Sequence, residues 1–228
     1  MRYENYNAKG QEGAVIDELE RETLMHYDAE GNLYQIDMPA LTNVDTQDVS
    51  YLSAGSIINA KGQVSQTTDL RGHTTTYTYY LAGHVSAGQK WTEANDISGT
   101  VTYTYDANNN VKTEARERSV NNVLVTETVS YDYDDRDRLA KTTYPDATYT
   151  ETKYDLAGNI DEERDRFGIW TDYDYDVYGR LTLTTYVDET TEIRGYSKEG
   201  LLESVIDRMG RETQYEYDAS ARLWKTTF

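Results

Sequence analysis

Apolar and polar residues alternate with a period of two in short runs along much of the chain. In Thr213–Tyr217, Thr and Tyr share one side while Gln and Glu share the other, and Thr171–Tyr175 and Thr102–Tyr105 follow the same rule. This alternation is typical of half-buried β-strands, and it predicts one aromatic and aliphatic face and one charged face. Six or seven residues separate successive turn signals, so each strand is expected to span roughly 20–23 Å.

The turn signal is the motif Asp-x-x-Gly. Asp at the first position accepts backbone N–H groups in a type I turn, and Gly at the fourth position tolerates a positive φ. In a hairpin, this combination predicts a type I turn closed by a bulged Gly. One copy is Asp96–Gly99, and the predicted structural turn residues of the other copies are Asp28, Gly31, Asp69, Gly72, Asp155, Gly158, Asp165, Gly168, Asp176, Gly179, Asp207 and Gly210.

A longer repeat, Tyr-Asp-x-x-Gly-(Arg/Asn)-Leu, contains this motif. Clear copies begin at Tyr27, Tyr154 and Tyr175, and weaker ones begin at Tyr79, Tyr105, Tyr133, Tyr196 and Tyr217, with degenerate copies at Tyr6 and Ile58. From Tyr133 onward the copies recur every 21 residues. Each unit therefore predicts two antiparallel strands and two turns. The fold class is all-β, a β-hairpin repeat array forming a curved or spiral sheet, with residues 1–228 as one array that is most regular over 131–228 and looser over 1–130.

The spacing between copies widens at three places in the looser part. The first excess, between Tyr27 and Ile58, contains Pro39 and the small residues 53–56, which predict a longer loop. A second lies between Tyr79 and Tyr105. The third contains Asn121-Asn122 between Val-rich flanks and predicts a lengthened hairpin. Residues 14–27 are the best helix candidate, but they lack caps, so strand or loop is expected there.

Composition narrows the function classes. The chain has 22 Tyr but only five Phe plus Trp, which suits a pleated, half-buried surface better than a deep globular core. With 41 acidic against 22 basic residues, the net charge of −19 opposes binding to nucleic acids and anionic membranes. The absence of Cys excludes disulfides and Cys-based zinc sites. No apolar run approaches membrane-spanning length, and the first residues do not start a signal peptide.

These repeats resemble the Rhs/YD-repeat family, which includes bacterial polymorphic toxins, insecticidal toxin-complex subunits and teneurins. The similarity covers most of the chain and is densest over residues 131–228. It implies a β-sheet that spirals into a hollow shell around a C-terminal toxin or other polypeptide, and carbohydrate binding in some members. It also implies that the parent protein works outside the cell or at the cell surface, with its export signal outside this segment.

The chain departs from the family pattern in two respects. It lacks the Pro- and Gly-rich motif that closes such shells, since its only prolines are Pro39 and Pro145, and its last residues, 225–228, lie inside a repeat. The parts expected to carry cleavage or toxicity are therefore absent from this sequence.

Candidate catalytic, cofactor and metal sites are all weak, and none is predicted. Asp172, Asp174 and Asp176 could share a strand face, but the sixth position of an EF-hand loop would be Val177 instead of Gly. A second acidic cluster spans 132–137; solvated faces and turns explain both clusters. With 41 acidic residues, some carboxylate pair at glycosidase spacing is expected by chance. The histidines, which are His26, His73 and His84, fit neither a metal motif nor a triad.

Aromatic side chains are the best candidates for ligand binding. Tyr rings on a sheet can stack on sugars, although packing on Leu139, Leu181 and Leu223 is the simpler interpretation for the tyrosine rows, which comprise Tyr103, Tyr105, Tyr173, Tyr175, Tyr215 and Tyr217. Possible ligand-stacking residues are Trp91, Trp170 and Trp224, which do not recur at one repeat position.

The sequence thus predicts a non-enzymatic scaffold whose partners are the rest of a YD-repeat shell and its enclosed polypeptide. A carbohydrate-binding or adhesive module is the alternative, and a glycoside hydrolase is the third candidate. Ten units imply about twenty strands and a sheet on the order of 96 Å wide, too narrow when closed into a ring to enclose a folded domain. A curved wall with a Tyr- and Leu-rich concave face and two unpaired edges is expected. It is either a monomer whose sheet curls tightly on itself or a chain that associates edge to edge at high concentration.

Overall fold

The computed structural model describes residues 1–39, 41–42, 49–50 and 52–228, and these contain β-strands and turns but no helix. Twenty strands belong to one sheet in which every described pairing is antiparallel, while β5 (Leu41–Thr42) and β6 (Val49–Ser50) pair separately. The prediction of an all-β hairpin array of about twenty strands is therefore confirmed. Backbone contacts divide the chain into two compact units, Met1–Thr128 and Val129–Phe228.

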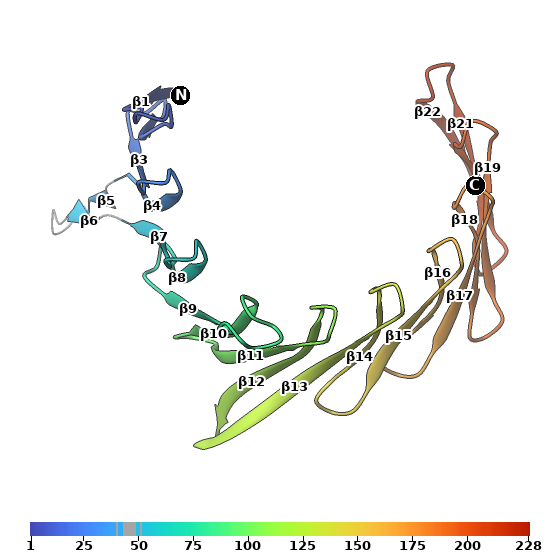
Figure 1. The fold of residues 1–228 in the computed structure, drawn as a ribbon. Helices are drawn as coiled ribbons and strands as arrows, with labels where there is room; N and C mark the ends of the chain where they lie inside the picture. The colour runs from blue at the N-terminus through green and yellow to red at the C-terminus, as the bar shows by residue number, and fades with distance from the viewer. Residues whose placement is uncertain (40, 43–48, 51) are drawn as a thin grey trace. The chain divides into compact units, whose positions relative to one another are not determined.

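In the first unit each strand pairs with the next one along the chain, apart from the separate β5–β6 ladder (Figure 1). The strands are β1 Arg2–Glu4, β2 Ala14–Ile16, β3 Glu22–Tyr27, β4 Leu33–Asp37, β7 Ser53–Ile58, β8 Val64–Thr68, β9 Thr74–Tyr79, β10 Lys90–Asn95, β11 Gly99–Tyr105, β12 Val111–Val120 and β13 Val123–Tyr133, whose last residues belong to the second unit.

The structure accounts for the looser spacing of this unit and corrects one prediction made for it. Residues 14–27 form β2, a turn and β3, as expected for strand or loop. The prediction that residues 53–56 are part of a loop is wrong, because they begin β7; Gly55 lies so close to the Tyr34 carbonyl oxygen that an added Cβ would sit 2.8 Å from it. The extra residues lie in 38–52, which the structure describes only in part, and in the loop 80–89 between β9 and β10.

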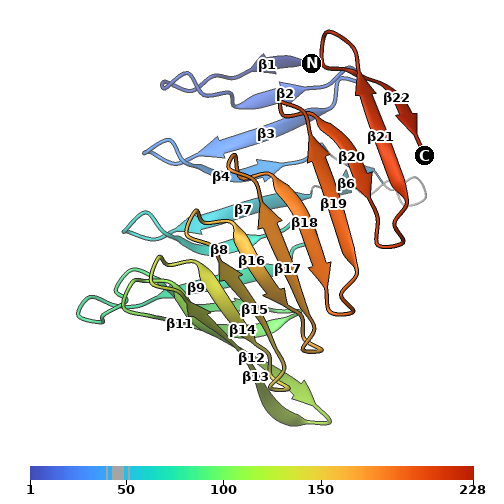
Figure 2. The ribbon, with the colours of Figure 1, turned by 90° about the vertical axis from the view of Figure 1, so that its right-hand side faces the viewer.

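The second unit is the most regular part of the chain, a meander of strands joined by short turns (Figure 2). Every second turn of this unit is preceded by a shift in register at the repeat tyrosine, as between Asp174 and Tyr175, which is a β-bulge. Its remaining strands are β14 Leu139–Thr143, β15 Tyr149–Tyr154, β16 Ile160–Arg164, β17 Trp170–Tyr175, β18 Leu181–Tyr186, β19 Thr191–Tyr196, β20 Leu202–Ile206, β21 Glu212–Tyr217 and β22 Leu223–Thr227.

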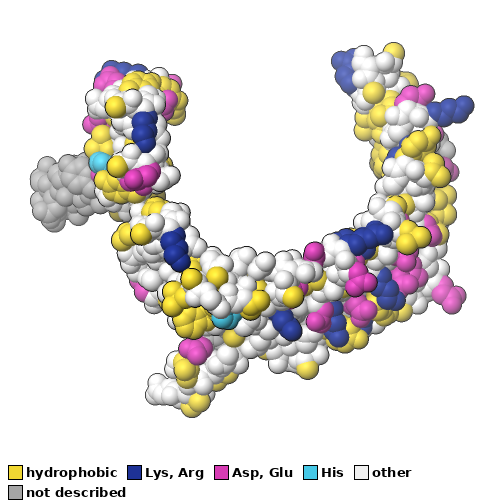
Figure 3. Space-filling model, viewed as in Figure 1, with side chains coloured by type: hydrophobic (Ala, Val, Ile, Leu, Met, Phe, Trp, Pro, Cys, Tyr) yellow, Lys and Arg dark blue, Asp and Glu magenta, His cyan; other side chains and the backbone are white. Residues whose placement is uncertain are grey.

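Neither unit has a conventional hydrophobic core. Among the described residues, the buried hydrophobic side chains are Ala14, Ile16 and Val101, and no large side chain is fully buried. Instead, neighbouring side chains cover one another on a single layer of strands; Thr184, which is directly opposite Tyr173, is 4% exposed. Hydrophobic and charged side chains share the surface in Figure 3.

The two faces of β17 follow the predicted alternation. Tyr173 is paired with Thr184 on one face, whereas Asp172 and Asp174 are exposed on the other. The second face is not purely charged, because Leu183 is directly opposite both Asp174 and Ile193. None of the described residues forms a helix that could span a membrane.

Candidate functional site

The turns of the second unit share one five-residue design, which Asp176–Arg180 illustrates. The Asp176 N–H donates to the Arg180 carbonyl at 3.0 Å, and the Gly179 N–H donates to the Asp176 carbonyl at 2.9 Å. Asp176 Oδ1 accepts the N–H groups of Tyr178 and Arg180 at 2.9 and 3.0 Å. Gly179 has φ +77°, so the turn is a type I turn followed by a bulged residue.

The structure places all twelve predicted turn residues in turns of this design. The six aspartates accept backbone N–H groups within their own turns, and the six glycines all have φ between +76° and +101°. The copy at Asp96–Gly99 differs: Asn95, one residue earlier, accepts the N–H groups of Ile97 and Ser98, and it pairs directly with Gly99. At this copy the motif therefore does not mark the shared turn design.

Several turns of the same design lack the motif. Their fourth residue has a positive φ without being Gly, as for Asp137, Ala147, Glu189 and Ala221, with φ of 59–64°. The turns at Asp137 and Ala221 belong to the weaker repeat copies at Tyr133 and Tyr217. Those at Ala147 and Glu189 carry no Asp-x-x-Gly motif, and only the expectation of two turns in each 21-residue unit points to them.

Arginines at the fifth turn position connect successive turns on one edge of the second unit. Arg180 forms an ion pair with Asp176 of its own turn, at 2.6 Å from Nε to Oδ2. Its guanidinium also lies over the ring of Tyr196, 4.7 Å from the centroid, and Nη1 donates to the Ser197 carbonyl at 3.2 Å. Arg138, 42 residues earlier, pairs with its own turn's Asp and lies 4.0 Å over the corresponding Tyr ring.

A second arginine contact connects turns on the opposite edge. Arg166 lies over the ring of Tyr144 at 4.1 Å and donates to Asp146 Oδ2 and Thr148 Oγ1 at 2.7 and 2.9 Å. Forty-two residues later, Arg208 makes the same contacts with the turn 186–190, at 4.0, 2.7 and 2.8 Å. We call these Arg–Tyr contacts, made by Arg138, Arg166, Arg180 and Arg208, the turn clamps. Their period is two 21-residue repeats.

The repeat tyrosines are also fixed at their hydroxyl ends. The hydroxyls of Tyr154, Tyr196 and Tyr217 each donate at 3.0 Å to the carbonyl of the residue 15 positions earlier, at the start of the preceding strand. Tyr79 and Tyr105 in the first unit do the same at 2.6 and 2.8 Å. For Tyr154 and Tyr196, an arginine covers the ring and a carbonyl binds the hydroxyl. This geometry makes them packing residues.

Contacts in the turn clamps and in the tyrosine rows shift the pKa values of the residues that form them. Hydrogen bonding and charge from the Arg138 guanidinium hold the pKa of Asp134 at about 2, and Arg180 lowers the pKa of Asp176 in the same way. Burial, together with a hydrogen bond to Glu163 at 3.0 Å, raises the pKa of Tyr173 to about 12. These carboxylates and this phenol therefore stay in one protonation state near neutral pH.

The tryptophans do not form a common platform. Trp91, in the first unit, is 47% exposed and 5.9 Å from the Tyr80 ring. Trp170 is half-buried in β17, with Lys153 Nζ 4.3 Å from its ring, while Trp224 in β22 is 64% exposed. Four strands lie between β17, which carries Trp170, and β22, which carries Trp224. The two strands are therefore about 24 Å apart.

The described residues offer little catalytic chemistry. The closest approach to a triad is at Asp37, whose carboxylate binds His26 at 2.8 Å and the Ser53 hydroxyl at 2.6 Å. The serine hydroxyl therefore donates to the carboxylate, whereas in a triad it would donate to the histidine. Hydrogen bonds from Ser53, Gln35 and His26 hold the pKa of Asp37 at about 2.

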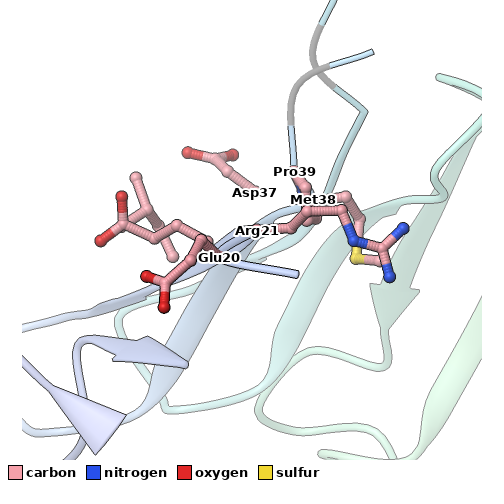
Figure 4. A pocket seen from close by; sticks show the side chains of 7 residues that line it. Glu20, Arg21, Asp37, Met38 and Pro39 are labelled. Atoms are coloured by element: carbon pink, nitrogen blue, oxygen red, sulfur yellow. The ribbon is translucent and has the colours of Figure 1, made fainter. Parts of the chain in front are cut away.

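Two further candidates also fail as chemical sites. Asp37 borders an open hollow beside Glu20, Arg21, Met38 and Pro39, where the labelled side chains project in different directions (Figure 4). No group of three or more His, Cys, Asp and Glu side chains among the described residues is arranged to hold a metal ion.

Comparison with solved structures shows the fold. The chain is similar to chains of TcdB2-TccC3 and of TcdB2-TccC3 without its hypervariable C-terminal region, with TM-scores of 0.53 and 0.52 and 14% identity in both. The similarity covers 89% and 94% of this chain but only 14% of each of those chains, so the chain spans a small part of their length. No family model and no curated protein matches the sequence.

Proposed function

We propose that this chain is a non-enzymatic structural scaffold, a segment of an Rhs/YD-repeat β-shell. In a longer protein, that shell would enclose or present a toxin or effector polypeptide, outside the cell or at its surface. The observation that carries the proposal is the pair of turn clamps on each edge of the second unit, which fix the spacing of neighbouring hairpins. The fold similarity to the TcdB2-TccC3 chains supports the same role.

The contacts made by the polar side chains also support a scaffold role. Carboxylates such as Asp134 and Asp176 are engaged by arginines of their own turns, and repeat tyrosines are engaged at both ring and hydroxyl. Side chains whose polar atoms hold the turns together make the sheet rigid. A wall that must exclude solvent and proteases needs such rigidity over many strands.

The experiment is limited proteolysis of the protein that carries this segment, comparing wild type with Arg138→Ala/Arg180→Ala. The polypeptide that follows the array should resist trypsin in the wild type and be cleaved sooner in the double variant, because loosened hairpins admit the protease. Lys225→Ala is the control, since it removes an exposed ion pair with Glu216 and no turn clamp. Cleavage of the wild-type polypeptide at the rate of an unfolded reference would contradict the proposal.

A carbohydrate-binding role is the second candidate, favoured by one observation. Trp224 borders a hollow that Tyr215, Tyr217, Glu203 and Glu216 also line, and an exposed indole beside carboxylates suits sugar recognition. Glycan-array binding that Trp224→Ala abolishes would support this role. Binding that survives this substitution, or no binding to any glycan, would exclude this hollow as the site.

A further inference from the structure

The β12–β13 hairpin extends past its neighbours. Its strands have 10 and 11 residues, and they are joined by Asn121 and Asn122, whose φ values of 52° and 62° define a type I′ turn. Strand β11 pairs with β12 only as far as Thr100↔Glu117, and β14 pairs with β13 only from Ser130 onward. The tip of the hairpin projects beyond β11 in Figure 1. Within the described residues, Val123–Thr128 therefore has no strand on its outer side.

The outer side of Val123–Thr128 presents backbone hydrogen-bonding groups. A two-residue turn makes Val120 and Val123 a hydrogen-bonded pair, so the N–H groups of alternate residues point away from β12. The outward groups belong to Leu124, Thr126 and Thr128. Backbone groups of this kind are a template for pairing with another strand.

The side chains of this edge favour pairing as well. Val123, Leu124 and Val125 are 62%, 66% and 36% exposed, and hydrophobic atoms reach the tip of the hairpin in Figure 3. The segment Val123–Thr128 contains no proline, lysine or glycine, which are residues that usually protect an exposed edge. Branched apolar and threonine side chains are also strong strand formers.

The neutral charge of the hairpin favours a second copy of the chain as the partner. The whole chain carries −19, which opposes the approach of a second copy through most of its surface. Residues 111–128 are neutral, because Lys112, Arg116 and Arg118 balance Glu114, Glu117 and Glu127. This segment is therefore a place where two copies can meet without net repulsion between the surfaces in contact.

We propose that Val123–Thr128 is a homotypic docking edge, where a second copy of the chain adds its own Val123–Thr128 as an antiparallel strand. With Thr126 on the twofold axis, Thr126 is opposite Thr126 of the partner subunit, and Leu124 is opposite Thr128 of the partner subunit. In this register Val125 is opposite Glu127 of the partner subunit, so no like charges face each other. Pairing here is independent of any polypeptide that the array encloses.

Sedimentation velocity of the full chain over a dilution series tests this proposal. Wild type should show a monomer–dimer equilibrium. Leu124→Lys should weaken the dimer affinity by about tenfold or more, because the dimer would desolvate a charge. Thr126→Pro should weaken it by a similar factor, because it removes an outward N–H. Thr126→Pro leaves the pairing to β12 intact, because the amide it removes points outward. Leu156→Lys makes the same change at a turn tip that is 93% exposed, and it should dimerise like wild type.

Hydrogen exchange supplies a readout specific to the edge. The amides of Leu124, Thr126 and Thr128 should become protected as the wild-type concentration rises. A wild type that stays monomeric, a dimer that persists unchanged in both hairpin variants, or equal weakening by Leu156→Lys would each overturn the proposal.

Discussion

Arg180 and Arg222 occupy the same position of two turns but have different surroundings. Both pair with the first Asp of their own turn, at 2.6 Å for Arg180 and 2.8 Å for Arg222. The Arg180 side chain is 26% exposed beneath the following turn, whereas that of Arg222 is 79% exposed. The pair therefore separates the contribution of the turn clamp from that of the ion pair within the turn.

Arg180→Ala is expected to destabilise the chain by about 1 kcal/mol, the size of a part-desolvated cation–π contact with its hydrogen bonds. Arg222→Ala should have a much smaller effect, since exposed ion pairs contribute little. Urea unfolding of both variants measures the difference. Equal losses would show that the contact with Tyr196 adds nothing.

Gly179→Val is expected to cost about 1–3 kcal/mol, because a β-branched residue is strained at φ +77°. Glu216→Gln, which removes an exposed ion pair with Lys225, should change stability far less. Thermal melts compare the two variants. Similar losses in both would contradict a special role for the turn glycine.

Acid should destabilise the chain between about pH 4 and pH 2. The pKa values of Asp134 and Asp37 are about 2 in the folded chain, against an ordinary 3.8. As the pH falls, the unfolded chain takes up protons first, so the stability from these carboxylates is complete above about pH 4 and lost toward pH 2. Asp134→Asn should flatten this loss in melting temperatures measured across the window. A variant with the wild-type slope would contradict the Arg138 contact as its cause.

At the scale of elements, hairpins were predictable where both the turn and the repeat follow the rules. Type I turns at Asp155 and Asp176 follow from Asp and Gly chemistry, and the hairpin at Asn121-Asn122 follows from its turn residues. The turns at Ala147 and Glu189 could not be predicted from motif chemistry, because neighbouring strands impose a positive φ on non-Gly residues there.

The turn clamps were missed for a different reason. They join residues about 16 to 22 positions apart in the chain, and their 42-residue period appears only when turns two repeats apart are compared, as for 144–148 with 186–190. The faces of the strands were predicted well at Tyr173 and less well at Leu183. The alternation of side chains assigns each residue to one of the two faces of its strand, but it does not identify the side chains that pack against it.

The acidic turns are expected to be independent of metal ions. Asp134 and Asp176 are each bound by an arginine and by backbone N–H groups, so these carboxylates already have partners. Treatment with a chelator should leave the melting temperature nearly unchanged. A fall of many degrees would show that a cation is bound by the acidic clusters at 132–137 or 172–176.

At the scale of the whole molecule, stability is spread over local contacts. The described chain has few buried hydrophobic residues and no large, fully buried side chain, yet its strands pair continuously from β14 to β22. The central claim is therefore that neighbouring repeats stabilise one another without a shared core, as in other repeat proteins.

Hydrogen exchange of the wild type and Arg180→Ala tests this claim most directly. In the wild type, amides in β14 to β21 should have similar protection. In Arg180→Ala, exchange should accelerate in β18, β19 and their turns while β14 and β15 keep the wild-type protection, because only adjacent repeats share contacts. An equal loss of protection in every strand of the second unit would contradict the claim, since it would show that a single cooperative core holds the unit together.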